Sequence, residues 1–206
     1  MNSPVTSGTR PTLTVIAGPN GSGKSTFTRT LRAASQAPIV DPDAIAREID
    51  PVAPEQAAVA AGREALRREA AYLENGVSFI IETTLSGNTM LRQMEHARQR
   101  GFDVRLIFIA TDNPRINIGR IVARVARGGH FVPDEDVQRR YMRSMRNLAR
   151  AIELVDEATI IDNTLEQGPH EALRIDAGQI TFQAQDLPAW VATHLGAFIA
   201  RRRDQS

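Results

Sequence analysis

The segment GPNGSGKS at residues 18–25 matches the phosphate-binding pattern GxxxxGK[ST] at every fixed position. An apolar, β-branched run at residues 12–17 (TLTVIA) precedes it and is typical of a buried strand. The residues that follow (STFTRTLRAA) are typical of a helix. Loops of this pattern bind phosphate where they connect a strand to the N-terminus of a helix. The segment therefore predicts a loop that binds nucleotide phosphates and not only a connecting turn.

Lys24 is the only lysine in the chain, which has 24 arginines. A compact ammonium can enter a narrow loop and reach β- and γ-phosphate oxygens, whereas a wide guanidinium cannot. We therefore expect Lys24 to act in catalysis and Ser25 to hold Mg²⁺. The nucleotide-binding residues predicted in this loop are Gly18, Pro19, Asn20, Gly21, Ser22, Gly23, Lys24, Ser25 and Thr26.

Apolar runs alternate with helical segments along the rest of the chain. Such alternation favours a parallel sheet covered on both faces, so we predict a three-layer α/β fold of the P-loop NTPase type with a mainly parallel five-stranded sheet. A hairpin over 173–182 and a terminal helix should follow. We expect residues 12–206 to form one domain after a disordered N-terminal tail at residues 1–11. The further strands are expected near 38–40, 77–81, 104–110 and 158–161, and the main helices from about 43 and over 55–74, 89–100 and 114–155.

Composition narrows the classes of protein. The absence of cysteine excludes disulfides, thiolate catalysis and zinc-thiolate sites, and the four histidines lack metal-ligand spacing, so we expect any metal to be Mg²⁺ that arrives with the nucleotide. No apolar run is long enough to cross a membrane and the N-terminus is polar, which predicts a cytoplasmic protein without a membrane partner. A formal charge of +1 argues against nucleic acid as the main partner.

Acidic residues follow two expected strands, at the sheet edge where functional residues of parallel sheets gather. Asp41 is suited to cap a helix that begins at Pro42. Asp43 then either belongs to that helix start or accepts a proton from an acceptor hydroxyl. Glu82 either holds Mg²⁺, binds a substrate hydroxyl or is a solvated strand end.

Nine arginines lie between residues 115 and 150. The spacing of the first helix in this stretch predicts an inner apolar face formed by Ile118, Ile121, Val122 and Val125. Its opposite face carries Arg120, Arg124 and Arg127. Arg140 flanks the core stripe of the next helix, and the glycine-containing corner at 128–133 joins the two. Residues 114–150 therefore predict either a hinged, arginine-bearing lid over a triphosphate or an exposed helical hairpin.

These segments together resemble the zeta toxin family of P-loop kinases in its short form. The resemblance is carried by GPNGSGKST, VDPDAIARE, FIIETTLSG, RVARGGHFVPDEDVQRRY and the DNT after the last strand of the core, over about residues 12–165. Members of this family phosphorylate a hydroxyl of UDP-activated amino sugars with ATP as donor. Many members also pair with an antitoxin protein, so the resemblance implies ATP, Mg²⁺, a small-molecule acceptor and an antitoxin partner.

The resemblance also implies roles for single residues. It makes Asp43 the general base and places Glu82 and Thr84 in contact with the acceptor. Among the lid residues, we expect Arg124 and Arg140 to act in catalysis. The remaining assignments are nucleotide binding for Arg120 and Asn163 and acceptor binding for Arg127 and His130.

Two other functions remain open from the sequence. A polynucleotide 5′-hydroxyl kinase would use the basic stretch to bind a phosphate backbone, and its affinity would fall steeply with salt. A nucleotide-dependent regulatory ATPase or binding module would use Glu82 to position water and would need no acceptor.

Overall fold

A computed structural model of the chain describes residues 10–204 and shows one seven-stranded sheet in the order β2-β3-β1-β4-β5-β6-β7. The first five strands are parallel, as expected. The expected hairpin continues the same sheet antiparallel to β5. The strands are β1 (Thr12–Ala17), β2 (Ile39–Val40), β3 (Phe79–Thr83), β4 (Asp103–Ala110), β5 (Glu157–Asp162), β6 (His170–Asp176) and β7 (Gln179–Gln183).

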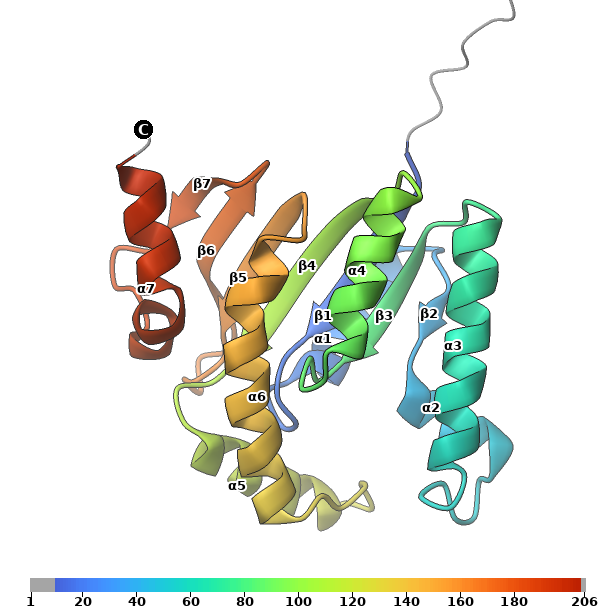
Figure 1. Cartoon of the computed structure of the whole chain (residues 1–206). Coiled ribbons are helices and arrows are strands. Elements are labelled where there is room, and N and C mark those ends of the chain that lie inside the picture. The colour runs from blue at the N-terminus through green and yellow to red at the C-terminus, as the bar shows by residue number, and fades with distance from the viewer. Residues whose placement is uncertain (1–9, 205–206) are drawn as a thin grey trace, which may run out of the picture.

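Helices cover both faces of the sheet, which confirms the predicted three-layer α/β architecture (Figure 1). One face packs against α3, α4, α6 and α7 in a large apolar core, and the other packs against α1 in a smaller one. The helices are α1 (Lys24–Ala34), α2 (Pro42–Ile49), α3 (Ala58–Glu74), α4 (Thr89–Gln99), α5 (Pro114–Val125), α6 (Asp134–Ile152) and α7 (Ala189–Arg203). No helix within residues 10–204 combines the length and the apolar character needed to cross a membrane.

The element boundaries differ from the sequence prediction at two turns. β3 begins at Phe79 rather than Val77, because Gly76 takes a positive φ of 63° after α3 and leaves Val77 partly exposed before the strand. α3 begins at Ala58 rather than near Glu55, because residues 54–57 form turns. Most of the expected N-terminal tail lies outside the described residues.

The inner face predicted for α5 was wrong at one position. Ile121 is buried against Val132 and Val137, with Ile118 and Val125 packed beside it. Val122 is 58% exposed, because α5 contacts α6 along a narrow seam that does not extend to the next helical position.

Candidate active site

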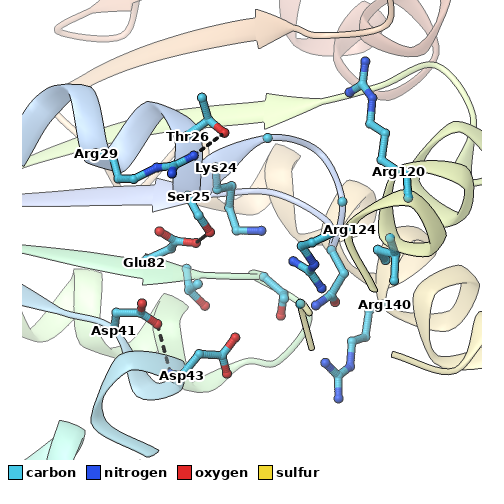
Figure 2. A pocket seen from close by; sticks show the side chains of 18 of the residues that line it. Lys24, Ser25, Thr26, Arg29, Asp41, Asp43, Glu82, Arg120, Arg124 and Arg140 are labelled. Atoms are coloured by element: carbon cyan, nitrogen blue, oxygen red, sulfur yellow. Dashed lines mark hydrogen bonds between the residues drawn. The ribbon is translucent and has the colours of Figure 1, made fainter. Parts of the chain in front are cut away.

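A cavity of about 780 Å³ lies at the C-terminal edge of the parallel strands, where the expected site residues meet. Figure 2 shows the acidic side chains of Asp41, Asp43 and Glu82 on one side of it and those of Arg124 and Arg140 on the other. The lining residues predicted from sequence are Asn20, Gly21, Gly23, Lys24, Ser25, Thr26, Asp43, Glu82, Thr84, Arg120, Arg124, Arg127 and Arg140.

The phosphate loop between β1 and α1 is shaped by close backbone packing. Gly18 has a φ of 143°, and a Cβ there would overlap the Ile109 carbonyl of β4. Asn163 supports the loop from the end of β5, because its Nδ2 donates a hydrogen bond of 2.8 Å to the Ser22 carbonyl. Asn163 does not line the cavity, so the structure places this residue behind the loop, where it fixes the backbone.

Lys24 begins α1 and is only 8% exposed. Its Nζ donates to the Pro19 carbonyl at 3.0 Å, which holds the ammonium inside the loop. Burial lowers the pKa of Lys24, and the carboxylates of Glu82 and Asp43 act in the opposite direction. A bound polyphosphate would supply further negative charge and favour the protonated amine.

Glu82, at the end of β3, accepts hydrogen bonds from two hydroxyls of α1. Ser25 Oγ lies 2.8 Å from one carboxylate oxygen and Thr28 Oγ1 lies 2.7 Å from the other. A hydroxyl and a carboxylate next to a phosphate loop are the oxygen ligands that Mg²⁺ accepts, with phosphate oxygens and water completing its shell. The donor set therefore fits Mg²⁺.

Asp41 and Asp43 follow β2 but have different surroundings. Asp41 is the N-cap of α2, since its Oδ1 accepts from the Asp43 backbone N–H at 3.0 Å and Pro42 takes the first helical position. Burial and the neighbouring Glu82 and Asp43 raise the pKa of Asp41. The Asp43 side chain is exposed to the cavity and takes no part in the cap.

The four arginines expected in the lid all line the cavity, from α5, α6 and the corner between them. Arg124 is held by the corner itself, since its Nη2 donates to the His130 carbonyl at 2.8 Å. The His130 side chain is exposed and does not line the cavity. Arg140 Nη2 lies 3.8 Å from Asp136 Oδ2. The Arg120 side chain points away from the carboxylates of Asp41, Asp43 and Glu82 (Figure 2).

Two polar residues of the cavity wall were given no role from the sequence. Arg29 lines the wall and its Nη2 donates to Thr26 Oγ1 at 3.3 Å. A sequence signal for it exists, because Arg29 is four residues after Ser25 and therefore shares its face of α1. Thr83 also lines the wall, next to the predicted Glu82 and Thr84.

A fixed loop follows β3. Leu85 has a positive φ of 54° and is fully buried, and its carbonyl accepts from Asn147 Nδ2 of α6 at 2.9 Å. The hydroxyls of Thr84 and Ser86 lie 2.8 Å apart. Because a positive φ is costly for a leucine, we infer that tertiary contacts hold this conformation and so fix Thr84 at the cavity wall.

A second pocket of about 250 Å³ adjoins the first and shares Pro42, Glu82, Thr83 and Thr84 with it. It lies between α3 and α4, and its wall includes Glu69, which is 6% exposed. Burial raises the pKa of Glu69 to about 7 against an ordinary value of 4.5, although a hydrogen bond from Gln93 acts in the opposite direction.

This shift predicts a pH-dependent contribution to stability. Glu69 ionises near pH 4.5 in the unfolded chain and near pH 7 in the folded chain. The neutral carboxyl therefore makes its full contribution to the free energy of unfolding below pH 4.5, and this contribution is lost as the pH rises through 7. Relative to Glu69→Gln, the wild type should lose about 3 kcal/mol of unfolding free energy across this interval. Urea unfolding of both proteins at a series of pH values measures the difference, and parallel curves would contradict the prediction.

Solved structures of low sequence identity share this fold. A chain of the AvrRxo1-ORF1:-ORF2 complex with ATP matches with a TM-score of 0.68 and 17% identity, over 84% of this chain and 61% of that chain. The present chain therefore spans about three fifths of that relative. The PezAT toxin-antitoxin system of Streptococcus pneumoniae matches with a TM-score of 0.62 and 15% identity, over 97% of this chain and 87% of that chain. A chain of the Pnkp1/Rnl/Hen1 RNA repair complex gives a TM-score of 0.56 with 19% identity, over 82% and 51% of the two chains.

Together, the mainly parallel sheet and the phosphate loop define the fold of a P-loop kinase. A model of the zeta toxin family matches residues 2–167, and the chain belongs to this family. An uncharacterized protein of Haemophilus influenzae is 40% identical over 124 residues, which are 60% of this chain and 88% of that protein.

Proposed function

We propose that this protein transfers the γ-phosphoryl group of ATP to a hydroxyl of a small molecule, a UDP-activated amino sugar. The observation that carries the proposal is that one cavity contains both the phosphate-loop Lys24 and the exposed carboxylate of Asp43. A phosphoryl donor and a proton acceptor on opposite sides of a cavity are the two requirements of a kinase.

The phosphate loop holds the donor in this scheme. Its backbone N–H groups and the N-terminus of α1 bind the phosphates, and Lys24 contacts the β- and γ-phosphate oxygens. Ser25 and Glu82 are suited to hold Mg²⁺, whose chemistry when bound is to neutralise charge on those oxygens. Asn163 keeps the loop in shape through the Ser22 carbonyl.

Asp43 acts on the acceptor. Its carboxylate takes the proton of the acceptor hydroxyl while that oxygen forms a bond to the γ-phosphorus. The bond between the γ-phosphorus and the β,γ-bridging oxygen breaks, and ADP leaves with the electron pair. Arg124 and Arg140 face this region across the cavity and stabilise negative charge on the transferred group, while Arg127 meets the acceptor and Arg120 the nucleotide.

The acidic wall supports a small acceptor over a polynucleotide. Asp41, Asp43 and Glu82 line the side of the cavity where the acceptor would lie. Their charges would repel the many backbone phosphates of a polynucleotide more strongly than the single diphosphate of a sugar nucleotide. The adjoining pocket gives a sugar nucleotide room beyond the reacting hydroxyl. Incubating labelled ATP with UDP-sugars, free sugars and 5′-hydroxyl oligonucleotides tests the assignment, and label found only on oligonucleotides would overturn it.

A nucleotide-dependent regulatory ATPase would behave differently in the same assay. It would release inorganic phosphate at a rate that no acceptor changes. Under our proposal, a UDP-sugar accelerates ATP consumption, and the γ-phosphoryl group of ATP is recovered on the sugar nucleotide.

We also propose a protein partner of the antitoxin type. The structures similar in fold include the PezAT toxin-antitoxin system and the AvrRxo1-ORF1:-ORF2 complex. Co-expression of the chain with the product of an adjacent gene, followed by co-purification, tests the proposal, and independent elution of the two proteins would contradict it.

Glu82→Gln should raise the Mg²⁺ concentration needed for half-maximal activity by about tenfold or more, because the amide removes the charge opposite the metal and disturbs its hydroxyl partner Ser25. Magnesium titration of the initial rate measures this change. Glu95→Gln, on exposed surface of α4, is the matched control and should titrate like the wild type. An unchanged magnesium requirement in Glu82→Gln would remove Glu82 from the metal site.

A further inference from the structure

Glu69 and Gln93 form a wall between two pockets. Both residues line the 250 Å³ pocket that adjoins the main cavity, and both line a further pocket of about 180 Å³ on its other side. Glu69 projects from α3 and Gln93 from α4, and Gln93 Nε2 donates a hydrogen bond to Glu69 Oε2. The small residues Gly62 and Ala65 line the 250 Å³ pocket beside this pair and leave space next to it.

Glu69 has no cationic partner in the described part of the chain. No arginine, lysine or histidine within residues 10–204 forms an ion pair with it. The charged groups that face the same pockets are Glu82 in the inner one and Glu74, His96 and Arg100 in the outer one. A buried carboxyl without a cationic partner is stable in its neutral form, which makes it a hydrogen-bond donor.

We propose that Glu69 and Gln93 determine acceptor specificity by binding a neutral amide or imide group of the acceptor through a pair of hydrogen bonds. Glu69 Oε1–H donates to the carbonyl of that group, and Gln93 Oε1 accepts from its N–H. A phosphate or carboxylate at this position would lie next to a carboxyl in a poorly solvated pocket and would be rejected. The inference rests on the proposed function, because it assigns the inner pocket to the non-reacting part of the acceptor.

The pair also gives acceptor binding a pH dependence. The burial that raises the pKa of Glu69 to about 7 keeps it mostly neutral near pH 6 and mostly ionised near pH 8.5. Since only the neutral form supplies the donor, acceptor affinity should fall at least tenfold between these values. The fraction of the protein with a protonated Glu69 falls about thirtyfold over this interval, so the acceptor affinity cannot fall by more than this factor.

Titration calorimetry of the full-length protein tests the inference with three probes. UDP-N-acetylglucosamine carries an amide and an imide, UDP-glucose carries only the uracil imide, and N-acetylglucosamine 1-phosphate carries only the amide. For the wild type, the dissociation constant of UDP-N-acetylglucosamine should rise at least tenfold from about pH 6 to about pH 8.5. A similar rise for UDP-glucose would identify the imide as the bound group, and a rise confined to the N-acetylated probes would identify the amide.

Glu69→Gln is the informative variant, because it keeps the size and hydrogen-bonding capacity of the side chain and removes its titration. Its affinity for UDP-N-acetylglucosamine should not change with pH. Glu74→Gln, five residues along α3 and outside the inner pocket, should keep the wild-type profile. Equal pH profiles for wild type and Glu69→Gln would overturn the inference, as would failure of all three probes to bind the wild type.

The two proposals can fail separately. If the probes bind with the expected pH dependence but receive no phosphate from ATP, the proposed function fails and the binding role of Glu69 stands. If UDP-N-acetylglucosamine is phosphorylated with the same pH profile by wild type and Glu69→Gln, the kinase assignment stands and the role of Glu69 fails.

Discussion

Asp43→Asn should lower kcat by about a hundredfold to ten-thousandfold and leave the dissociation constant of ATP within about threefold of the wild type. An amide of the same size cannot take the proton of the acceptor hydroxyl. Within residues 10–204, the Asp43 side chain forms no hydrogen bond or ion pair with the phosphate loop or the helix cap, so nucleotide binding and folding should survive. Steady-state rates of acceptor phosphorylation, together with calorimetric titration of ATP, measure the two quantities.

Asp41→Asn is the matched comparison because it alters the neighbouring carboxylate of the same cavity wall. Asparagine caps helices about as well as aspartate, so α2 should remain intact and the rate should stay within about tenfold of the wild type. The two variants together decide which carboxylate is the base. A severe defect in Asp41→Asn with an active Asp43→Asn would transfer that role to Asp41.

Lys24→Arg should lose about a thousandfold or more in kcat/KM, although it keeps the positive charge. Lys24 is almost fully buried and its ammonium donates to the Pro19 carbonyl inside the loop, so we expect a wider, planar guanidinium to disturb the loop. This requirement explains why the chain keeps one lysine at position 24 although its other 24 strongly basic residues are all arginines. Acceptor phosphorylation measured over a range of ATP concentrations gives the loss.

The single lysine also allows a direct test on the unmodified protein. An amine-acylating reagent should modify Lys24 and the chain N-terminus, and saturating MgATP should protect Lys24 alone, because the bound phosphates cover its amine. Peptide mapping by mass spectrometry separates the two positions. Near wild-type turnover by Lys24→Arg, or equal labelling of Lys24 with and without MgATP, would contradict the role assigned to this residue.

The sequence was most informative for features that are determined by adjacent residues. The phosphate loop, the parallel strands and the helix start at Pro42 each depend on a few adjacent residues, and the structure confirms all three. Two of the cavity-lining arginines were also predictable, because helical spacing places Arg120 and Arg124 on one face of α5. Arg127 was expected on the same face but follows the end of α5, in the corner.

Other features depend on contacts between distant segments, which periodicity does not encode. The support that Asn163 gives the phosphate loop joins residues 141 positions apart in the sequence. The Glu69–Gln93 pair likewise depends on how α3 and α4 pack against each other. Val122 was placed on the inner face of α5 by its spacing, but the actual seam with α6 is narrower than an ideal apolar stripe.

We propose that Lys24 and Asp43, which line the same cavity, act together to pass a phosphoryl group from ATP to a sugar nucleotide. The most direct measurement is transfer of label from γ-labelled ATP to UDP-N-acetylglucosamine, followed chromatographically for the wild type and Asp43→Asn. We predict a labelled sugar nucleotide from the wild type and a severely reduced yield from the variant. If label appears only in inorganic phosphate, at the same rate with and without the sugar nucleotide, the protein is not a sugar-nucleotide kinase.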